Sequence, residues 1–154
     1  MTLESVRAYL SLRAPDVNII ETGSSSATVA LAAEAHGVSP AQIAKTICVR
    51  VGETIMLIVT SGVARLDNRK FREVLGGKPR MLDADEVVAV TGHPVGGVCP
   101  FGLSSDLPVY CDVSLRNFVE VVPAAGAVNA AVRVSPERLA ELVGARWVDV
   151  CQSA

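Results

Sequence analysis

Two β-branched segments separated by only two residues constrain the fold more than any other feature of this sequence. Residues 46–51 (TICVRV) and 54–60 (TIMLIVT) are rich in Ile, Val and Thr, and Gly52 and Glu53 lie between them. This pattern predicts an antiparallel β-hairpin with a two-residue turn. The chain has 154 residues, of which 50% are hydrophobic, enough to bury one core around that hairpin. We therefore expect a single domain that spans residues 1–154.

Helix signals occur on both sides of the hairpin. A cluster of serines, residues 24–26, precedes an alanine-rich stretch that ends at a glycine. Ser135 followed by Pro136 is a typical helix start, and Gly144 is a typical helix end. Helices interspersed with strands in hairpins indicate an α+β domain with a mixed, mostly antiparallel sheet. We expect helices at 6–12, 28–36, 68–74, 86–90 and 136–143, one helical turn at 40–42, and further strands at 17–20, 109–112, 118–122 and 130–134.

The composition argues against several classes of protein. The net charge is −2 and the pI is near 5.7, unlike a protein that coats nucleic acid, DNA included, through bulk charge. No long uninterrupted apolar stretch suggests a membrane span, and the first residues lack the basic and apolar regions of a secretory signal. The four cysteines form no C-x-x-C pair, and their spacing to the two histidines matches no common zinc site. We expect a cytoplasmic protein with reduced thiols, no metal and no membrane or DNA partner.

The charge is nevertheless unevenly distributed. Residues 64–80 contain six basic and two acidic residues, a net charge of +4, whereas the rest of the chain carries eight basic and fourteen acidic residues, a net charge of −6. Such a segment can contact the phosphates of an anionic polymer while the rest of the surface avoids indiscriminate binding. It can equally be the solvated face of a helix. The residues in question within the predicted helix are Arg69, Lys70 and Arg72.

Lys45 is the first candidate for chemistry. It lies where the single helical turn meets the first long strand, between Ile43-Ala44 and Thr46-Ile47. A lysine in apolar surroundings costs desolvation energy unless its ammonium reaches a polar partner or a cleft. In a cleft it can donate to a phosphate, a carbonyl or a carboxylate. The alternative is a lysine whose long stem carries the charge to the surface.

A glycine-rich loop is the second candidate. Residues 92–102 (GHPVGGVCPFG) contain four glycines and two prolines, a composition that excludes regular structure and lets a ligand approach the backbone amides. The loop matches neither a Walker motif nor a dinucleotide-binding fingerprint. His93 as a general base and Cys99 as a nucleophile have no assignable partners, so a small buried residue is the better interpretation of Cys99. A purely structural crossing of the sheet is the alternative for the whole loop.

Taken in order, several short motifs resemble one family. The run 39–46 (SPAQIAKT), the loop 96–102 (GGVCPFG), the strand 108–112 (PVYCD) and the closing 138–142 (RLAEL) look like the YbaK/EbsC family, free-standing relatives of the editing domain of bacterial prolyl-tRNA synthetases. The resemblance covers residues 17–150. It implies a barrel-like mixed sheet surrounded by helices, and a pocket that hydrolyses the ester between a wrong amino acid and the 3′ end of a tRNA.

The resemblance also implies roles for particular residues. Lys45 matches a lysine that is needed for activity, and the backbone of Gly96, Gly97 and Val98 matches a loop near the scissile ester. Family members lack an evident protein nucleophile, and the substrate's own ribose hydroxyl or side chain assists the attack. The position of Cys99 is frequently serine in relatives, which leaves the choice of amino acid open. The turn that carries Gly126 and Asn129 faces the pocket in relatives, although Asn129 also fits a plain turn residue.

These observations lead to one leading hypothesis and two alternatives. The leading one is an aminoacyl-tRNA deacylase that acts in trans on a mischarged tRNA, tRNA-Pro carrying Cys, Ala, Ser or Thr, with no cofactor and with prolyl-tRNA synthetase as a further candidate partner. The first alternative is a non-catalytic module that binds tRNA or a synthetase. The second is a small-molecule esterase or phosphate-ester binder that uses the same pocket.

Overall fold

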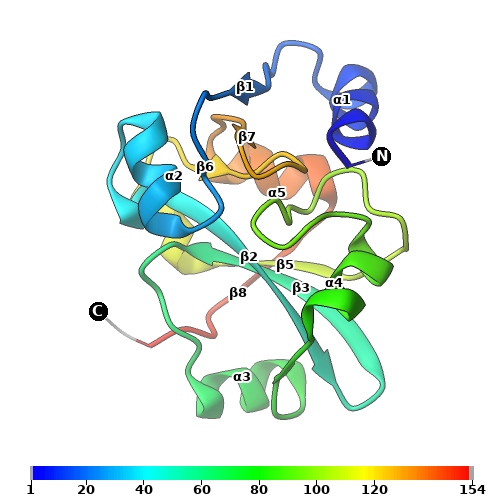
Figure 1. The fold of residues 1–154 in the computed structure, drawn as a ribbon. Helices are drawn as coiled ribbons and strands as arrows, with labels where there is room; N and C mark the ends of the chain where they lie inside the picture. The colour runs from blue at the N-terminus through cyan, green and yellow to red at the C-terminus, as the bar shows by residue number, and fades with distance from the viewer. Residues whose placement is uncertain (1, 153–154) are drawn as a thin grey trace.

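The computed structural model describes residues 2–152, in which helices surround an open, twisted sheet (Figure 1). The predicted hairpin is confirmed: β2 pairs with β3 in antiparallel register from Ala44↔Ser61 to Val51↔Thr54, around the turn at Gly52 and Glu53. The helices are α1 (Thr2–Arg13), α2 (Val29–His36), α3 (Asn68–Leu75), α4 (Ala84–Thr91) and α5 (Pro136–Val143), with 3₁₀ turns at Pro40–Gln42 and Val113–Asn117. The strands are β1 (Ile20–Glu21), β2 (Ile43–Val51), β3 (Thr54–Ser61), β4 (Arg80–Met81), β5 (Val109–Asp112), β6 (Val122–Pro123), β7 (Ala130–Ala131) and β8 (Arg146–Val148).

The main sheet mixes two strand directions. Its path runs β4-β2-β3-β5-β8, with β6 also pairing to β2, while β1 and β7 form a separate two-stranded sheet. The pairings of β2 with β3 and β4 are antiparallel, and those of β2 with β6, β3 with β5 and β5 with β8 are parallel. The expected α+β class with a mixed sheet and surrounding helices is therefore confirmed. The barrel-like closure is not found, because the main sheet remains open.

Side chains on the two faces of the hairpin enter different cores. Ala44 and Cys48 of β2 belong to the larger cluster, which includes residues of α1, α5 and the glycine loop. Val49 of β2 packs with Ile58 of β3 and with Phe71 of α3 in a second cluster. Since side chains alternate along a strand, α3 covers one face of the hairpin and the glycine loop lies toward the other (Figure 1).

The helix boundaries follow the capping residues. Asp67, Asp83 and Ser135 each accept a hydrogen bond from a backbone amide three residues further on, and glycines in the left-handed region end α2, α3, α4 and α5. The serines at 24–26 do not cap α2, because Thr28 does so by accepting a hydrogen bond from the Leu31 amide.

Several expected strands are shorter than their composition suggests. Of residues 118–122, only Val122 lies in a strand, and of 130–134 only Ala130 and Ala131 do. Among 17–20 the strand begins at Ile20. Residues 2–152 contain no helix that is long and apolar enough to cross a membrane.

Candidate active site

An apolar cavity lies along the outer edge of β2. It has a volume of about 360 Å³ and touches every residue from Ile43 to Cys48. Its other walls come from the start of α2, from β4, α4 and β6, and from the glycine loop through Val95, Gly96 and Val98. Most of the lining side chains are Ala, Val, Leu or Ile, so the cavity is predominantly apolar. A small apolar ligand group therefore fits it better than a charged one.

The apolar wall is interrupted by an unpaired stretch of strand. β2 pairs on its outer edge with β6 at Ile43 and Ala44, and with β4 at Val49 and Arg50. The four residues between these contacts, 45–48, have no strand partner on that edge within the described residues. Alternate residues of a strand direct their amide and carbonyl to the same side, so about two of these four present both groups to the cavity. The Thr46 hydroxyl beside them is buried and has no hydrogen-bond partner among the residues that the structure describes.

The glycine loop is packed closely against the opposite wall. A Cβ atom at Gly96 would lie 2.9 Å from Ala27 Cβ, and one at Gly97 would lie 2.8 Å from the Ala127 amide nitrogen. Gly96 also has φ of +93°, a conformation that favours glycine. These two glycines therefore bring the loop within reach of the cavity where a larger residue would push it away.

The three predicted amide donors of this loop are not equivalent. The Gly97 amide donates to the Pro94 carbonyl at 2.9 Å, and Gly97 is not among the residues that line the cavity. Gly96 and Val98 do line it, and among the described residues their amides donate to no partner. The two amides with free donor capacity therefore come from Gly96 and Val98, and the Gly97 amide holds the turn.

His93 and Cys99 lie beneath the loop. His93 is completely buried, and its Nε2 lies 2.7 Å from the Phe101 carbonyl oxygen, which it bonds across the loop. Burial lowers the pKa of His93, which favours the neutral ring. Cys99 is also completely buried, 3.6 Å from His93 Nε2, and burial raises the pKa of its thiol to about 12. Neither lines the cavity, so the pair braces the loop, and neither group is placed as general base or nucleophile.

Lys45 borders the cavity, but its ammonium points elsewhere. Its Nζ donates a 2.6 Å hydrogen bond to the Ala64 carbonyl beyond the end of β3. Strand alternation puts its side chain on the same face as Ile47 and Val49, toward α3. Burial lowers the pKa of Lys45 below its ordinary value, and the nearby Arg65 guanidinium acts in the same direction. To contact a ligand in the cavity, the ammonium has to leave Ala64 and turn toward the β2 edge.

The turn with Gly126 and Asn129 supports the site from outside. The Gly126 amide donates to the Gly97 carbonyl at 3.0 Å, which joins this turn to the glycine loop. Asn129 donates through Nδ2 to the Thr22 carbonyl, and its own carbonyl accepts from the Thr22 amide. Neither residue lines the cavity, although Ala124 and Ala131 on either side of the turn do.

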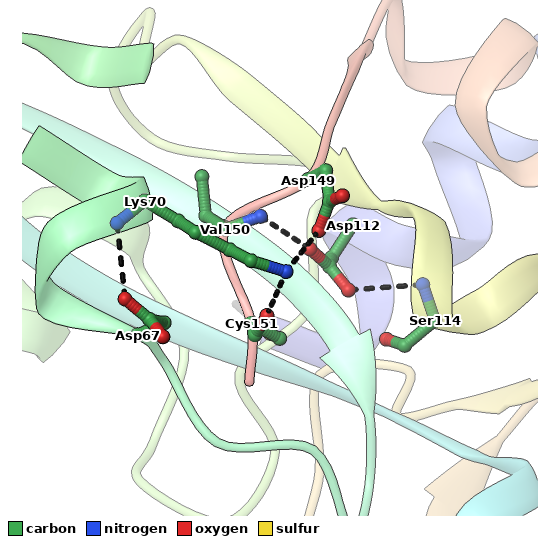
Figure 2. Close-up of polar contacts among 7 residues, drawn as sticks. All are labelled: Asp67, Lys70, Asp112, Ser114, Asp149, Val150 and Cys151. Atoms are coloured by element: carbon green, nitrogen blue, oxygen red, sulfur yellow. Dashed lines mark hydrogen bonds and ion pairs between the residues drawn. The ribbon is translucent and has the colours of Figure 1, made fainter. Parts of the chain in front are cut away.

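The basic residues predicted on α3 have two different environments. Lys70 extends from α3 to the C-terminal segment, where its Nζ bonds the Cys151 carbonyl at 2.9 Å and pairs with Asp149 at 3.2 Å (Figure 2). The same segment is held by Asp112, a buried carboxylate that accepts hydrogen bonds from the Val150 and Ser114 amides. Arg69 and Arg72 are exposed. All three lie on the helix that covers the face of the hairpin carrying Val49, and none lines the cavity.

Sequence reasoning missed part of the cavity wall. Thr46, Met81 and Leu82 line it, as does the exposed Val95 of the glycine loop. The short strand that places Met81 and Leu82 there has no local signal, because it consists of two residues paired to β2. A strand with such a long-range partner is recognised only when the fold is known.

Comparisons with known proteins point to one family. A model of the aminoacyl-tRNA editing domain matches residues 24–142. The uncharacterised protein YwhH of Bacillus subtilis is 46% identical over 154 residues, which cover 99% of this chain and 98% of YwhH. A crystal structure of a candidate trans-editing enzyme for prolyl-tRNA synthetase superposes with a TM-score of 0.90 at 32% identity, over 98% of this chain and 97% of that one.

Two further relatives carry names that concern tRNA. EbsC of Enterococcus faecalis, named as a candidate Cys-tRNA(Pro)/Cys-tRNA(Cys) deacylase, is 26% identical over 77% of this chain and 73% of its own. The proline–tRNA ligase of Shouchella clausii is 35% identical over 61% of this chain, which corresponds to 17% of the ligase. With the match of the family model over most of the sequence, these relatives show that the chain belongs to the aminoacyl-tRNA editing domain family.

Proposed function

We propose that this protein is an aminoacyl-tRNA deacylase that acts in trans and hydrolyses the ester of tRNA-Pro charged with a small wrong amino acid. The observation that carries the proposal is the apolar cavity at the unpaired edge of β2, in a chain of the editing-domain family. The match covers 98% of YwhH but only 17% of the proline–tRNA ligase of Shouchella clausii. This difference supports a protein that acts in trans and is not part of a synthetase.

The two walls of the cavity suit the two halves of an aminoacyl ester. The outward backbone groups of residues 45–48 and the Thr46 hydroxyl supply hydrogen-bond capacity for the α-ammonium and the ester. The free amides of Gly96 and Val98 supply donors for the carbonyl oxygen as it becomes an oxyanion. The amino-acid side chain then enters the apolar part of the cavity.

The proposed reaction is a hydrolysis without a protein nucleophile. Water adds to the ester carbonyl carbon, and the bond to the ribose oxygen breaks. The leaving oxygen takes up the proton that the water gives up, so the products are the free amino acid and a tRNA with an intact terminal hydroxyl. The neighbouring ribose hydroxyl of the substrate assists the proton transfer, and the Lys45 ammonium, once released from Ala64, stabilises the negative charge on the oxyanion.

The lining of the cavity favours particular amino acids. A methyl or thiol group meets mostly apolar walls there, whereas a hydroxyl exchanges its hydrogen bonds to water for the few polar groups of the lining, such as the Thr46 hydroxyl. We therefore propose alanine and cysteine as better substrates than serine and threonine. The name of the EbsC relative, which mentions Cys-tRNA, supports the cysteine assignment.

A panel of mischarged tRNAs tests this proposal. We expect the purified protein to release alanine or cysteine from tRNA-Pro at least about tenfold faster than serine or threonine. Equal rates for all four would refute the role given to the apolar wall. Binding of these tRNAs without turnover of any of them would replace the deacylase with a non-catalytic tRNA-binding module. Equal turnover of short aminoacyl-adenosine esters would favour a small-molecule esterase.

A further inference from the structure

A second hollow adjoins the cavity, and its walls are basic. It has a volume of about 510 Å³ and is lined by Arg50, Gly52, Lys78, Arg80, Met81 and Leu82. Met81 and Leu82 also line the apolar cavity, so the two spaces share these two residues as a common wall. We call the second space the basic groove. Met81, the residue between them, is 70% exposed, which leaves an apolar surface free at the junction.

Two arginines of the groove are placed in an unfavourable arrangement. Arg50 of β2 and Arg80 of β4 are directly opposite each other in the antiparallel pairing. Like charges at such positions, with Cβ atoms about 5 Å apart, destabilise a sheet. Glu86 pairs with Arg50 at 3.0 Å and relieves part of the repulsion. Arg80 has no ion-pair partner among residues 2–152, and an anion between the two guanidinium groups would relieve the rest.

The segment that carries the other cation is held close to the hairpin. A Cβ atom at Gly77 would lie 2.7 Å from Val51 Cγ1, so the glycine permits close packing just before Lys78. Lys78 is exposed and, like Arg80, forms no ion pair within the described residues. The groove thus presents two unpaired cations and one partly neutralised cation beside the cavity.

We infer that the basic groove binds the phosphate backbone of the tRNA acceptor arm, next to the terminal nucleotide whose ester enters the cavity. This inference rests on the proposed function for the identity of the RNA. Arginine suits phosphate because its planar guanidinium donates two parallel hydrogen bonds. The competing surface is α3, but α3 covers the other face of the hairpin, and its Lys70 is bound to the C-terminal segment (Figures 1 and 2).

The test compares two double variants that remove the same charge. Lys78→Gln/Arg80→Gln changes the groove, and Arg69→Gln/Arg72→Gln changes α3. The probe is an uncharged tRNA-Pro, and its affinity is measured over a range of salt concentrations. We expect the groove variant to bind about tenfold more weakly and to lower the salt slope by about 2, with little effect of the α3 variant. Loss of affinity in the α3 variant alone would overturn the inference.

Two features of the test distinguish this inference from the proposed function and from a purely structural role of Arg80. Because uncharged tRNA is the probe, binding is measured even if the protein hydrolyses no ester, so a failure of the proposed function is distinguishable. The single variant Arg80→Gln removes the repulsion with Arg50, and we expect its Tm to stay level or rise while RNA affinity falls. A lower Tm would identify Arg80 as a stabilising residue and would contradict the argument from repulsion.

Discussion

The proposed role of Lys45 requires its ammonium in the cavity, but the ammonium points elsewhere in the structure. The ammonium bonds the Ala64 carbonyl and lies on the α3 face of the hairpin, although the residue borders the cavity. A lysine stem is long and flexible, so one carbonyl partner can be exchanged for another. In the structure, the ammonium is bonded to the Ala64 carbonyl and does not point into the cavity.

A substitution tests whether this ammonium acts on the substrate. We expect Lys45→Met, which keeps the apolar stem and removes the charge, to lower kcat/KM for Ala-tRNA(Pro) by about 100-fold. The matched control is Lys70→Met, since Lys70 also donates to a backbone carbonyl but lies away from the cavity. Equal kcat/KM for Lys45→Met and the unaltered protein would remove Lys45 from the mechanism.

The same residue predicts a pH dependence of activity. Burial lowers the pKa of Lys45 from its ordinary value of 10.5, so the ammonium is present at low pH and is lost as the pH rises through that lowered pKa. After correction for spontaneous ester hydrolysis, we expect kcat/KM to fall on the alkaline side with a midpoint below 10.5. The Lys45→Met variant should lack this alkaline decline. A decline retained in that variant would assign the titration to another group.

At the scale of elements, three contacts hold the backbone of the glycine loop in place. His93 bonds the Phe101 carbonyl across its base, the Gly126 amide bonds the Gly97 carbonyl, and Gly97 lies against the backbone of Ala127. These contacts set the positions of the Gly96 and Val98 amides at the cavity. Catalysis by such donors depends on placement within a fraction of an ångström.

A single added methyl group should therefore disturb the loop. We expect Gly97→Ala, whose Cβ would lie 2.8 Å from the Ala127 nitrogen, to lower kcat about tenfold or more with a smaller effect on KM. Gly23→Ala is the control, because a Cβ there meets nothing within 4 Å. If kcat were unchanged in Gly97→Ala while the protein stayed folded, the loop amides would have no part in the reaction.

The elements that could be predicted from the sequence are those that depend on interactions between residues close together in the chain. The β2–β3 hairpin depends on a two-residue turn, and α3, α4 and α5 depend on side chains that bond amides three residues away. The strands expected at 118–122 and 130–134 are shorter in the structure, because continuous strand structure there is limited to Val122–Pro123 and Ala130–Ala131 and is extended only by single bridges such as Val121↔Val134. The short β4 and β8 have no local signal at all.

Sequence reasoning predicts only part of the residues that line the cavity, and it does not predict the geometry of the cavity. Lys45, Gly96 and Val98 do border one cavity, whereas Gly97, Cys99, Gly126 and Asn129 lie behind its wall. Which side of a loop faces a cavity depends on packing against distant segments, such as Ala127 against Gly97. The unpaired edge of β2 depends in turn on where β4 and β6 end, and both are long-range partners.

For the whole molecule, the net charge of −2 is the sum of a basic segment and an acidic remainder of the chain. The cations of residues 64–80 do not form one patch: Lys78 and Arg80 line the basic groove beside the cavity, whereas Arg69 and Arg72 lie on α3. An acidic body with a small basic groove suits an enzyme that holds one end of a tRNA briefly and releases it. The overall charge thus limits the affinity for RNA without excluding it.

On the proposed function, a mischarged ester is hydrolysed in the cavity at the β2 edge. The most direct measurement is the rate of alanine release from Ala-tRNA(Pro) by the unaltered protein and by Val95→Trp, which places a large side chain at the rim where Val95 is 57% exposed. We predict rapid release by the unaltered protein and none above the spontaneous rate by Val95→Trp, with the same Tm for both. Release by Val95→Trp at the unaltered rate would contradict the assignment of this cavity as the active site.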